Sequence, residues 1–290
     1  GRVGGALSAD PRIAGVAFTG STETARRINR TLAERDTSIA TLIAETGGQN
    51  AMIVDSSALA EQVVRDVIHS AFLSAGQRCS ALRVLYVQRD VADRVLEMLA
   101  GAMQELRIGW PGRLATDIGP VIDRNQLEML ERHAARMDSE ARLIARVPDP
   151  ESAPEGYWFT PRAYEIDSID RLDGEIFGPI LHVVRYSARD IDRVIEQING
   201  TGFGLTAGCH SRIDRVQRHV IHSIHAGNAY VNRNMTGAVV GVQPFGGEGL
   251  SGTGPKAGGP NYLQRFAVER TRTINTAAVG GNASLMALSE

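Results

Sequence analysis

Cysteine 79 is the residue of this sequence best suited to covalent chemistry. It follows a long amphipathic segment and lies in the polar stretch Gly76-Gln77-Arg78-Cys79-Ser80. The thiolate is the reactive form of cysteine, and a polar turn beside an arginine favours its formation. A single cysteine is more often a small buried hydrophobic residue, and we favour that interpretation for Cys209, which lies in an apolar strand-like segment. Cys79 is therefore the candidate nucleophile.

Two glutamates stand in glycine-containing motifs on either side of this cysteine. Glu45 ends an apolar stretch and precedes Gly47-Gly48, so that it is a candidate general base toward water. Glu175 lies in Glu175-Ile176-Phe177-Gly178-Pro179; its functional interpretation is a carboxylate that accepts hydrogen bonds from ribose hydroxyls, with Phe177 as a wall for a nicotinamide. The alternatives are a surface glutamate at a strand end and a turn that enters a strand.

A third feature is the turn at Gly20-Ser21, between a short apolar strand and a helix. Free backbone N–H groups and the positive end of a helix dipole would meet there, where a pyrophosphate can bind. The segment lacks the G-x-G-x-x-G pattern, and ordinary helix capping by Ser21 is the alternative.

Composition limits the classes of function. The chain has 290 residues, 43% of them hydrophobic, and a formal net charge of -2, which argues against nucleic acid as a partner. No apolar stretch is long enough to span a bilayer, and we expect a cytoplasmic protein with both cysteines reduced. The seven histidines show no metal-binding spacing; His222 and His225 lack a third ligand nearby, so we interpret the histidines as surface residues and predict no metal site.

The elements that must position these residues alternate between strand and helix, which predicts an α/β fold. Strands are expected at 13–18, 40–44, 51–54, 84–87, 157–165, 180–186, 204–209 and 228–232, and helices at 22–34, 59–72, 90–106, 123–138, 188–199 and 212–224. The second helix-forming stretch, 59–72, leads into the segment Gly76–Cys79. A last alternating segment, 271–276, is expected to be an edge strand that pairs with another subunit.

Taken together, these residues resemble the aldehyde dehydrogenase superfamily. Five motifs occur in the family's order: Phe18-Thr19-Gly20-Ser21-Thr22, Glu45-Thr46-Gly47-Gly48, Gly76-Gln77-Arg78-Cys79, Glu175-Ile176-Phe177-Gly178-Pro179 and Pro244-Phe245-Gly246-Gly247. The segments 44–50, 79–83 and 236–241 look most like 1-pyrroline-5-carboxylate dehydrogenases, which are also called glutamate-semialdehyde dehydrogenases. The segment 276–282 looks like the bacterial bifunctional proline utilization A family, in which a proline dehydrogenase domain lies upstream.

The resemblance implies a mechanism and a set of site residues. Cys79 would attack the aldehyde, NAD would accept the hydride, and Glu45 would activate water to release glutamate from the thioester. The implied NAD-binding residues are Gly20, Ser21, Gly47, Glu175 and Phe177. The implied contacts to the substrate and its α-carboxylate are the Ser80 hydroxyl, the backbone N–H groups of Gly237 and Ala238, and the aromatic wall of Phe245.

The resemblance also implies an organisation. Residues 1–46 would be the C-terminal part of a Rossmann-like NAD-binding domain, 47–262 an α/β catalytic domain, and 263–290 a closing segment with an oligomerisation strand. The chain is expected to be the C-terminal portion of a homo-oligomeric enzyme and to be inactive or severely impaired alone. The alternatives are a dehydrogenase for another small aldehyde and a non-catalytic oligomerisation or scaffold fragment.

Overall fold

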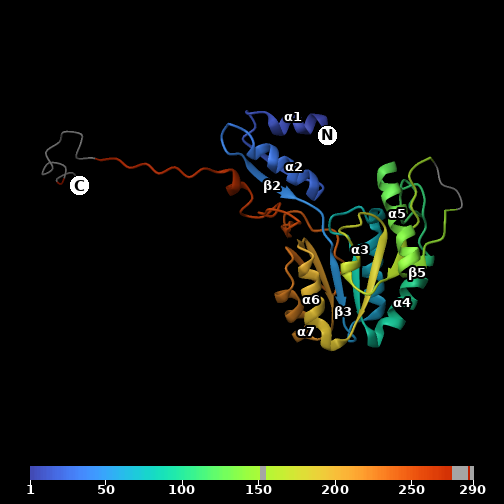
Figure 1. Cartoon of the computed structure of the whole chain (residues 1–290). Helices are drawn as coiled ribbons and strands as arrows, with labels where there is room; N and C mark the ends of the chain where they lie inside the picture. The colour runs from blue at the N-terminus through green and yellow to red at the C-terminus, as the bar shows by residue number, and fades with distance from the viewer. Residues whose placement is uncertain (151–154, 276–286, 288–290) are drawn as a thin grey trace.

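A large, mainly parallel sheet forms the centre of the protein (Figure 1). The computed structural model describes residues 1–150, 155–275 and 287. Within them the sheet runs in the order β10-β9-β3-β4-β7-β6-β5, and only the β5–β6 pair is antiparallel. Its strands are β3 Ala51–Val54, β4 Val84–Gln88, β5 Arg142–Arg146, β6 Arg162–Glu165, β7 Ile180–Tyr186, β9 Thr206–His210 and β10 Asn228–Val231.

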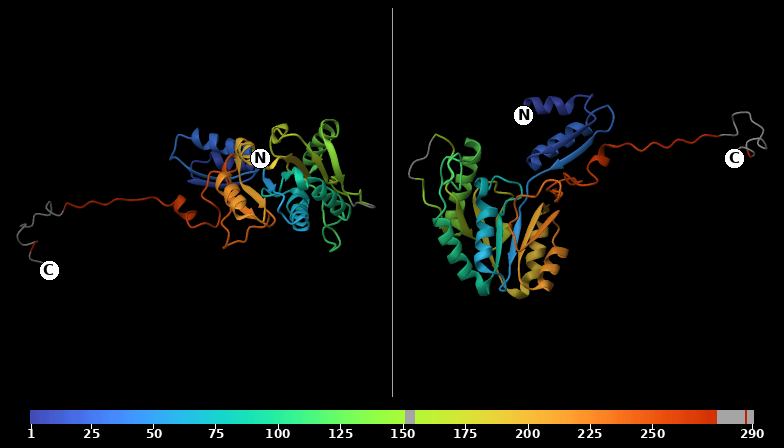
Figure 2. Two further views of the ribbon diagram at one scale, coloured as in Figure 1. Left: turned by 90° about the horizontal axis from the view of Figure 1, so that it is seen from below. Right: turned by 180° about the vertical axis from the view of Figure 1, so that it is seen from behind.

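Helices cover both faces of this sheet because its crossovers run in two directions. The step from β3 to β4 goes one way along the sheet and the step from β9 to β10 goes the other, and right-handed crossovers then place their helices on opposite faces. Figures 1 and 2 show α3 and α4 on one face and α6 and α7 on the other. The helices are α3 Ala60–Phe72, α4 Arg89–Gln104, α5 Arg124–Glu140, α6 Ile191–Gly200 and α7 Asp214–Ser223.

The N-terminal part forms a second, smaller sheet. Strands β1 Gly15–Thr19 and β2 Thr41–Glu45 pair in parallel, so that Thr19 and Glu45 are register partners. Helices α1 Arg2–Ala9 and α2 Thr22–Ala33 lie beside it (Figure 1). The chain passes from β2 into β3 of the large sheet within a few residues, so that Glu45 lies at the junction of the two sheets.

The C-terminal part closes this junction and then leaves it. Short strands β8 Phe203–Gly204 and β11 Glu248–Gly249 pair, and the Thr253 N–H donates to the Ala44 carbonyl at 2.9 Å. After the 3-10 turn η4 Leu263–Phe266, residues 267–275 extend away from the body (Figures 1 and 2) and are exposed. Residues 271–275 belong to no strand of the described chain and Thr276 lies outside the described residues. The subunit-pairing strand stays a prediction.

The α/β prediction is confirmed, with local errors. The expected strand 157–165 is confined to β6, because Pro161 lacks the N–H that a ladder needs. Strand β5 was not expected. It is an antiparallel edge strand that has an arginine at each end and whose first two residues are exposed, so that it lacks the apolar run of a buried strand. Helix α1 was not expected either, since three of its residues or caps are glycines.

Among the described residues, no helix has both the length and the apolar character needed to cross a membrane.

Candidate active site

Cys79 lies in a loop at the amino ends of the central parallel strands. The loop is held by Asn50, whose amide nitrogen donates to the carbonyls of Cys79 at 2.6 Å and of Ala81 at 2.9 Å. The Asn50 side-chain oxygen accepts the Thr206 N–H at 3.1 Å. One buried amide therefore joins the starts of β3 and β9 to the segment that precedes β4.

The approach to Cys79 is a strained backbone turn. After α3, the 3-10 turn η1 Leu73–Gly76 contains three residues in succession with positive φ: Ser74 at 57°, Ala75 at 52° and Gly76 at 64°. Non-glycine residues in this region are held there only by their surroundings. A Cβ atom on Gly76 would lie 2.3 Å from the Gly178 carbonyl oxygen, so that the nucleophile loop and the Glu175 motif are in direct contact.

Glu175 lies between this loop and the glycines after Glu45. Its Oε1 accepts from Arg83 Nη2 at 3.0 Å, and its Oε2 occupies the space in front of Gly47, where a Cβ would come within 1.8 Å. The Phe177 ring packs on the Arg83 guanidinium, with 5.1 Å from the carbon to the ring centroid. The structure thus brings together three of the predicted cofactor residues, Gly47, Glu175 and Phe177.

Glu45 is buried, which excludes the alternative interpretation of a surface glutamate at a strand end. Its Oε2 accepts the Gly247 N–H at 3.2 Å and its carboxylate lies against Gly246, where a Cβ would be 2.5 Å from Oε1. Oε1 itself is buried without a partner among the described residues. Burial raises the pKa of Glu45 to about 7, so that the carboxyl exchanges its proton near neutral pH.

The Cys79 thiol is half-buried, and burial raises its pKa, followed by the negative charge of Glu175 and, more weakly, that of Glu45. The charges of both carboxylates therefore oppose ionisation of the sulfur. The expectation that Arg78 eases thiolate formation is wrong: Arg78 is exposed and its Nε donates to the Ser74 hydroxyl at 3.1 Å. The raised pKa favours the thiol form of Cys79.

The predicted substrate residues lie on two loops that share an anchor. Ser80 is buried next to the nucleophile. The helix residue Ser70 accepts the Leu82 N–H through its carbonyl at 2.9 Å and the Met235 N–H through its hydroxyl at 3.0 Å. This places Gly237 and Ala238, two and three residues after Met235, on a loop tied to the same turn of α3 as the nucleophile segment.

Phe245 directly precedes the two glycines that enclose Glu45. Its N–H and carbonyl both bond to Ala257, at 3.0 and 2.8 Å, and its side chain is half-buried.

Gly20 and Ser21 lie at the exposed start of α2, at the same sheet edge as Glu45. The Gly20 N–H is not free as expected, because it donates to the Glu45 carbonyl at 3.1 Å. Ser21 caps α2 by accepting the Thr24 N–H at 3.2 Å. Capping is therefore present, and phosphate binding at this turn stays a prediction.

The interpretation of the histidines as surface residues is wrong for three of them. His133, His182 and His210 are buried, and burial lowers the pKa of His133 to about 4 and of His182 to about 3. His225 lies beyond the end of α7. Among the described residues no group of three or more histidine, cysteine, aspartate or glutamate side chains is arranged to hold a metal. Cys209 is buried as expected, and burial raises its pKa to about 12.

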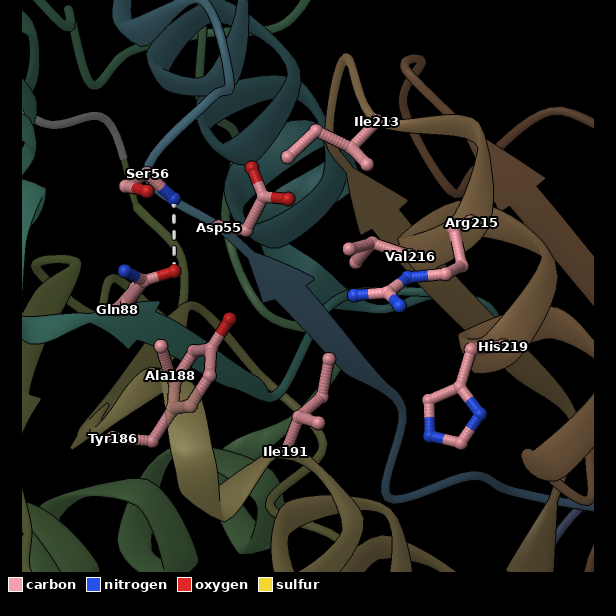
Figure 3. Close-up of a pocket in the computed structure, with 10 residues that line it drawn as sticks. All are labelled: Asp55, Ser56, Gln88, Tyr186, Ala188, Ile191, Ile213, Arg215, Val216 and His219. Atoms are coloured by element: carbon pink, nitrogen blue, oxygen red, sulfur yellow. Dashed lines mark hydrogen bonds between the residues drawn. The ribbon is translucent and has the colours of Figure 1, made fainter.

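A separate cavity of about 520 Å³ opens at the opposite end of the sheet (Figure 3). Asp55, Gln88 and Tyr186 line it from the carboxyl ends of β3, β4 and β7. Its polar groups bond mainly to the protein itself: Asp55 accepts from Ser57 and Ser211, and the Tyr186 hydroxyl donates to the Val54 carbonyl. Of the described side chains that line it, none belongs to the predicted site.

Two site residues were missed by sequence reasoning, Asn50 and Arg83. Both follow recognised motifs, Asn50 two residues after the double glycine and Arg83 four residues after Cys79. Each is a polar residue directly before an apolar strand. This was the available signal, because an arginine or asparagine that is buried there needs hydrogen-bond partners.

Comparison with known proteins identifies the family of the chain. A sequence model described as "Aldehyde dehydrogenase family" matches residues 1–271. "Bifunctional protein PutA" of Klebsiella aerogenes is 58% identical over 276 residues, which are 92% of this chain and 21% of that protein. "1-Pyrroline-5-carboxylate dehydrogenase" of Geobacillus kaustophilus is 36% identical over 266 residues, 90% of this chain and 51% of that protein.

Solved structures share the fold of the chain over more than nine-tenths of its length. A crystal structure of bifunctional proline utilization A has a TM-score of 0.91 and 61% identity, and the match covers 96% of this chain and 28% of that one. A 1-pyrroline-5-carboxylate dehydrogenase from Thermus with bound NAD has a TM-score of 0.85 and 35% identity over 91% of this chain and 51% of that one. The chain therefore spans about a fifth to a half of the length of these relatives.

Proposed function

The chain belongs to the aldehyde dehydrogenase family, and from this premise we propose that it carries the nucleophile and general base of an enzyme that oxidises L-glutamate 5-semialdehyde to L-glutamate with NAD. The semialdehyde is the open form of 1-pyrroline-5-carboxylate, which would place the reaction in proline catabolism. The observation that carries the proposal is that the nucleophile loop contacts the Glu175 motif, whose carboxylate lies against Gly47, two residues after the buried Glu45. The names of the PutA and 1-pyrroline-5-carboxylate dehydrogenase relatives support the choice of substrate.

The proposed reaction begins with Cys79. Its sulfur bonds to the aldehyde carbon while its proton leaves to the medium, and the carbonyl oxygen becomes an alkoxide. The oxyanion would be met by backbone N–H groups of the nucleophile loop, because a fixed donor costs little reorganisation during the reaction. Loss of two electrons and the aldehyde hydrogen then converts the thiohemiacetal into a thioester.

The residues near Cys79 fit the nicotinamide end of NAD. Gly47 leaves the space that the Glu175 carboxylate occupies, and that carboxylate presents acceptors suited to ribose hydroxyls. Phe177 supplies a flat apolar wall, and Gly20 and Ser21 would face the pyrophosphate. NAD, when bound, supplies the hydride acceptor. The Thermus relative solved with NAD supports this assignment.

Glu45 would complete the reaction by hydrolysis. A carboxyl group with a pKa of about 7 is suited to accept a proton from water at neutral pH. The resulting hydroxide adds to the thioester carbon, and the sulfur leaves as a thiolate that regains its proton. Glutamate is released.

The substrate's α-carboxylate requires donors, because a desolvated anion without hydrogen bonds is costly. Ser80 is the proposed hydroxyl donor, and Gly237 and Ala238 the proposed backbone donors. The shared Ser70 anchor of the two loops supports this assignment, because it fixes the loop of Gly237 relative to Cys79. Phe245 would pack against the substrate's methylene chain.

The proposal extends to the organisation of the chain. Residues 1–46 would belong to the NAD-binding domain, 47–262 to the catalytic domain, and 263–290 to a closing segment that pairs subunits of a homo-oligomer in the cytoplasm. The separate small sheet β1–β2 supports the first boundary.

Kinetics of the Ser80→Ala variant test the substrate assignment. On the full-length natural protein, we expect KM for the semialdehyde to rise by about tenfold to a hundredfold, as loss of a hydrogen bond to a charged group costs roughly 1.5–3 kcal/mol. KM for propanal, which has no carboxylate, should change far less. Equal effects on both substrates would favour the rival assignment, a dehydrogenase for another small aldehyde.

A further inference from the structure

Arg83 is the most fully enclosed charge in the described chain, with 1% of its side chain exposed. A buried guanidinium is retained only where several acceptors surround it. Its Nη1 donates to the carbonyls of Gly76 at 2.7 Å and Gly178 at 3.2 Å. Its Nη2 donates to the Arg78 carbonyl at 3.1 Å and to Glu175 Oε1 at 3.0 Å.

These four acceptors come from two segments that are almost a hundred residues apart. Gly76 and Arg78 belong to the nucleophile loop, whereas Glu175 and Gly178 belong to the motif proposed to face the cofactor. The same Nη2 atom bonds to both segments. A movement of the Glu175 carboxylate therefore also affects Arg83 Nη2, which donates to the Arg78 carbonyl next to Cys79.

The strained turn makes this contact consequential. Ser74, Ala75 and Gly76 hold positive φ values, a conformation that relaxes unless neighbouring groups determine it. Arg83 holds the last of the three through its carbonyl, and the Gly178 carbonyl leaves no space for a Cβ atom on the same glycine. The Arg83 guanidinium is thus placed to fix the turn that aims Cys79.

We propose that Arg83 is a positioning residue that couples Glu175 to the nucleophile loop, so that occupation of the Glu175 carboxylate by a cofactor ribose and the reactivity of Cys79 depend on each other. Arg83 touches no reacting atom in this arrangement. The inference rests on the proposed function only for the identity of the cofactor. The coupling itself is a property of this chain's contacts.

The test is a double-mutant cycle read out by alkylation of Cys79. The 290-residue chain and its variants Arg83→Lys, Glu175→Gln and the combination are treated with iodoacetamide over a range of pH, and the rate at Cys79 is followed by peptide mass spectrometry. Lysine keeps the charge but lacks the fork that reaches four acceptors. Buried Cys209 is the internal control for unfolding.

Coupled residues should give non-additive effects. We expect the rate change in the double variant to depart at least about fivefold from the product of the two single changes. The matched control is Arg185→Lys, which alters an ion pair with Asp93 and Glu165; combined with Glu175→Gln it should give the simple product. Additive effects for Arg83 and Glu175 would overturn the proposal.

A second variant covers the case in which Arg83→Lys does not fold. Glu175→Asp keeps the negative charge but shortens the side chain by one methylene, which moves the carboxylate away from Arg83. The variant therefore removes the hydrogen bond to Arg83 without removing the charge. We expect the pH profile of Cys79 alkylation to shift, and an unchanged profile would contradict the coupling. Neither readout needs dehydrogenase activity, so that failure of the proposed substrate and failure of this inference are distinguishable.

Discussion

At the scale of single residues, the site consists of ionisable groups whose ordinary behaviour is altered by burial. Desolvation disfavours the charged form of a group, and it raises the pKa of both Glu45 and Cys79. Burial first, and then the charges of Glu175 and Glu45, favour the neutral thiol form of Cys79. In the proposed chemistry, Cys79 therefore loses its proton only during the reaction. The general base, Glu45, is half-protonated near pH 7.

The altered pKa of Glu45 predicts a pH-dependent stability effect. Because the folded-state pKa of about 7 exceeds the ordinary value of 4.5, the ionised carboxylate destabilises the fold progressively between these two values, fully above pH 7. Glu45→Gln should therefore raise the free energy of unfolding by about 1–3 kcal/mol at pH 8 and change it little near pH 4. Urea unfolding at both pH values measures this.

Glu61→Gln is the matched control, because Glu61 is an exposed glutamate paired with Arg94. Its effect should stay below about 1 kcal/mol at both pH values. Equal stability of the Glu45→Gln variant and the wild type at pH 8 would contradict the desolvated state of the carboxyl.

At the scale of elements, the decisive feature is the turn between α3 and β4. A regular helix delivers the chain to this point, and three left-handed residues then reverse it toward Cys79. Asn50 and Arg83 bond to the carbonyls of the loop that follows. The nucleophile loop is therefore held by the residues that immediately precede β3 and β4.

Substitution of glycine by alanine should change stability in opposite directions in this turn and inside a regular helix. Gly76→Ala should destabilise the protein by at least about 2 kcal/mol, because the residue has positive φ and its Cβ would meet the Gly178 carbonyl. Gly101→Ala, inside α4 with open space around it, should stabilise by about 0.5–1 kcal/mol. Denaturant unfolding should give opposite signs for the two, and equal signs would contradict the strained turn.

Local patterns allowed most elements and the main site residues to be predicted. Strand β3 and the helix before Cys79 follow from apolar runs and helical spacing, which are properties of neighbouring residues. The role of Arg83 could not be predicted in this way, because its acceptors lie on segments that meet only in the fold. The same holds for the burial of His133 and His182, which bond to each other from α5 and β7.

At the scale of the whole molecule, the C-terminal segment joins the two sheets and then continues as an arm. Thr46 N–H donates to the Ser251 carbonyl at 2.9 Å, and Ala44 N–H to the Thr253 hydroxyl at 3.0 Å. These bonds fix Glu45 between them. Residues 267–275, in contrast, are exposed along their length, and their pairing with another subunit stays a prediction.

Truncation after Phe266 tests this interpretation. We expect the free energy of unfolding at low protein concentration to change by less than about 0.5 kcal/mol, and self-association measured by light scattering to be lost. An oligomer of unchanged size would show that the arm does not hold subunits together.

The central claim is that Cys79 captures the aldehyde carbon and Glu45 releases the product. The most direct measurement is the mass of the Cys79 peptide from a Glu45→Gln variant of the full-length natural protein, quenched after incubation with L-glutamate 5-semialdehyde and NAD. We expect a glutamyl thioester on Cys79 that forms only with NAD and is hydrolysed slowly enough to be detected. Turnover of this variant at the wild-type rate, with Cys79 unmodified, would contradict it.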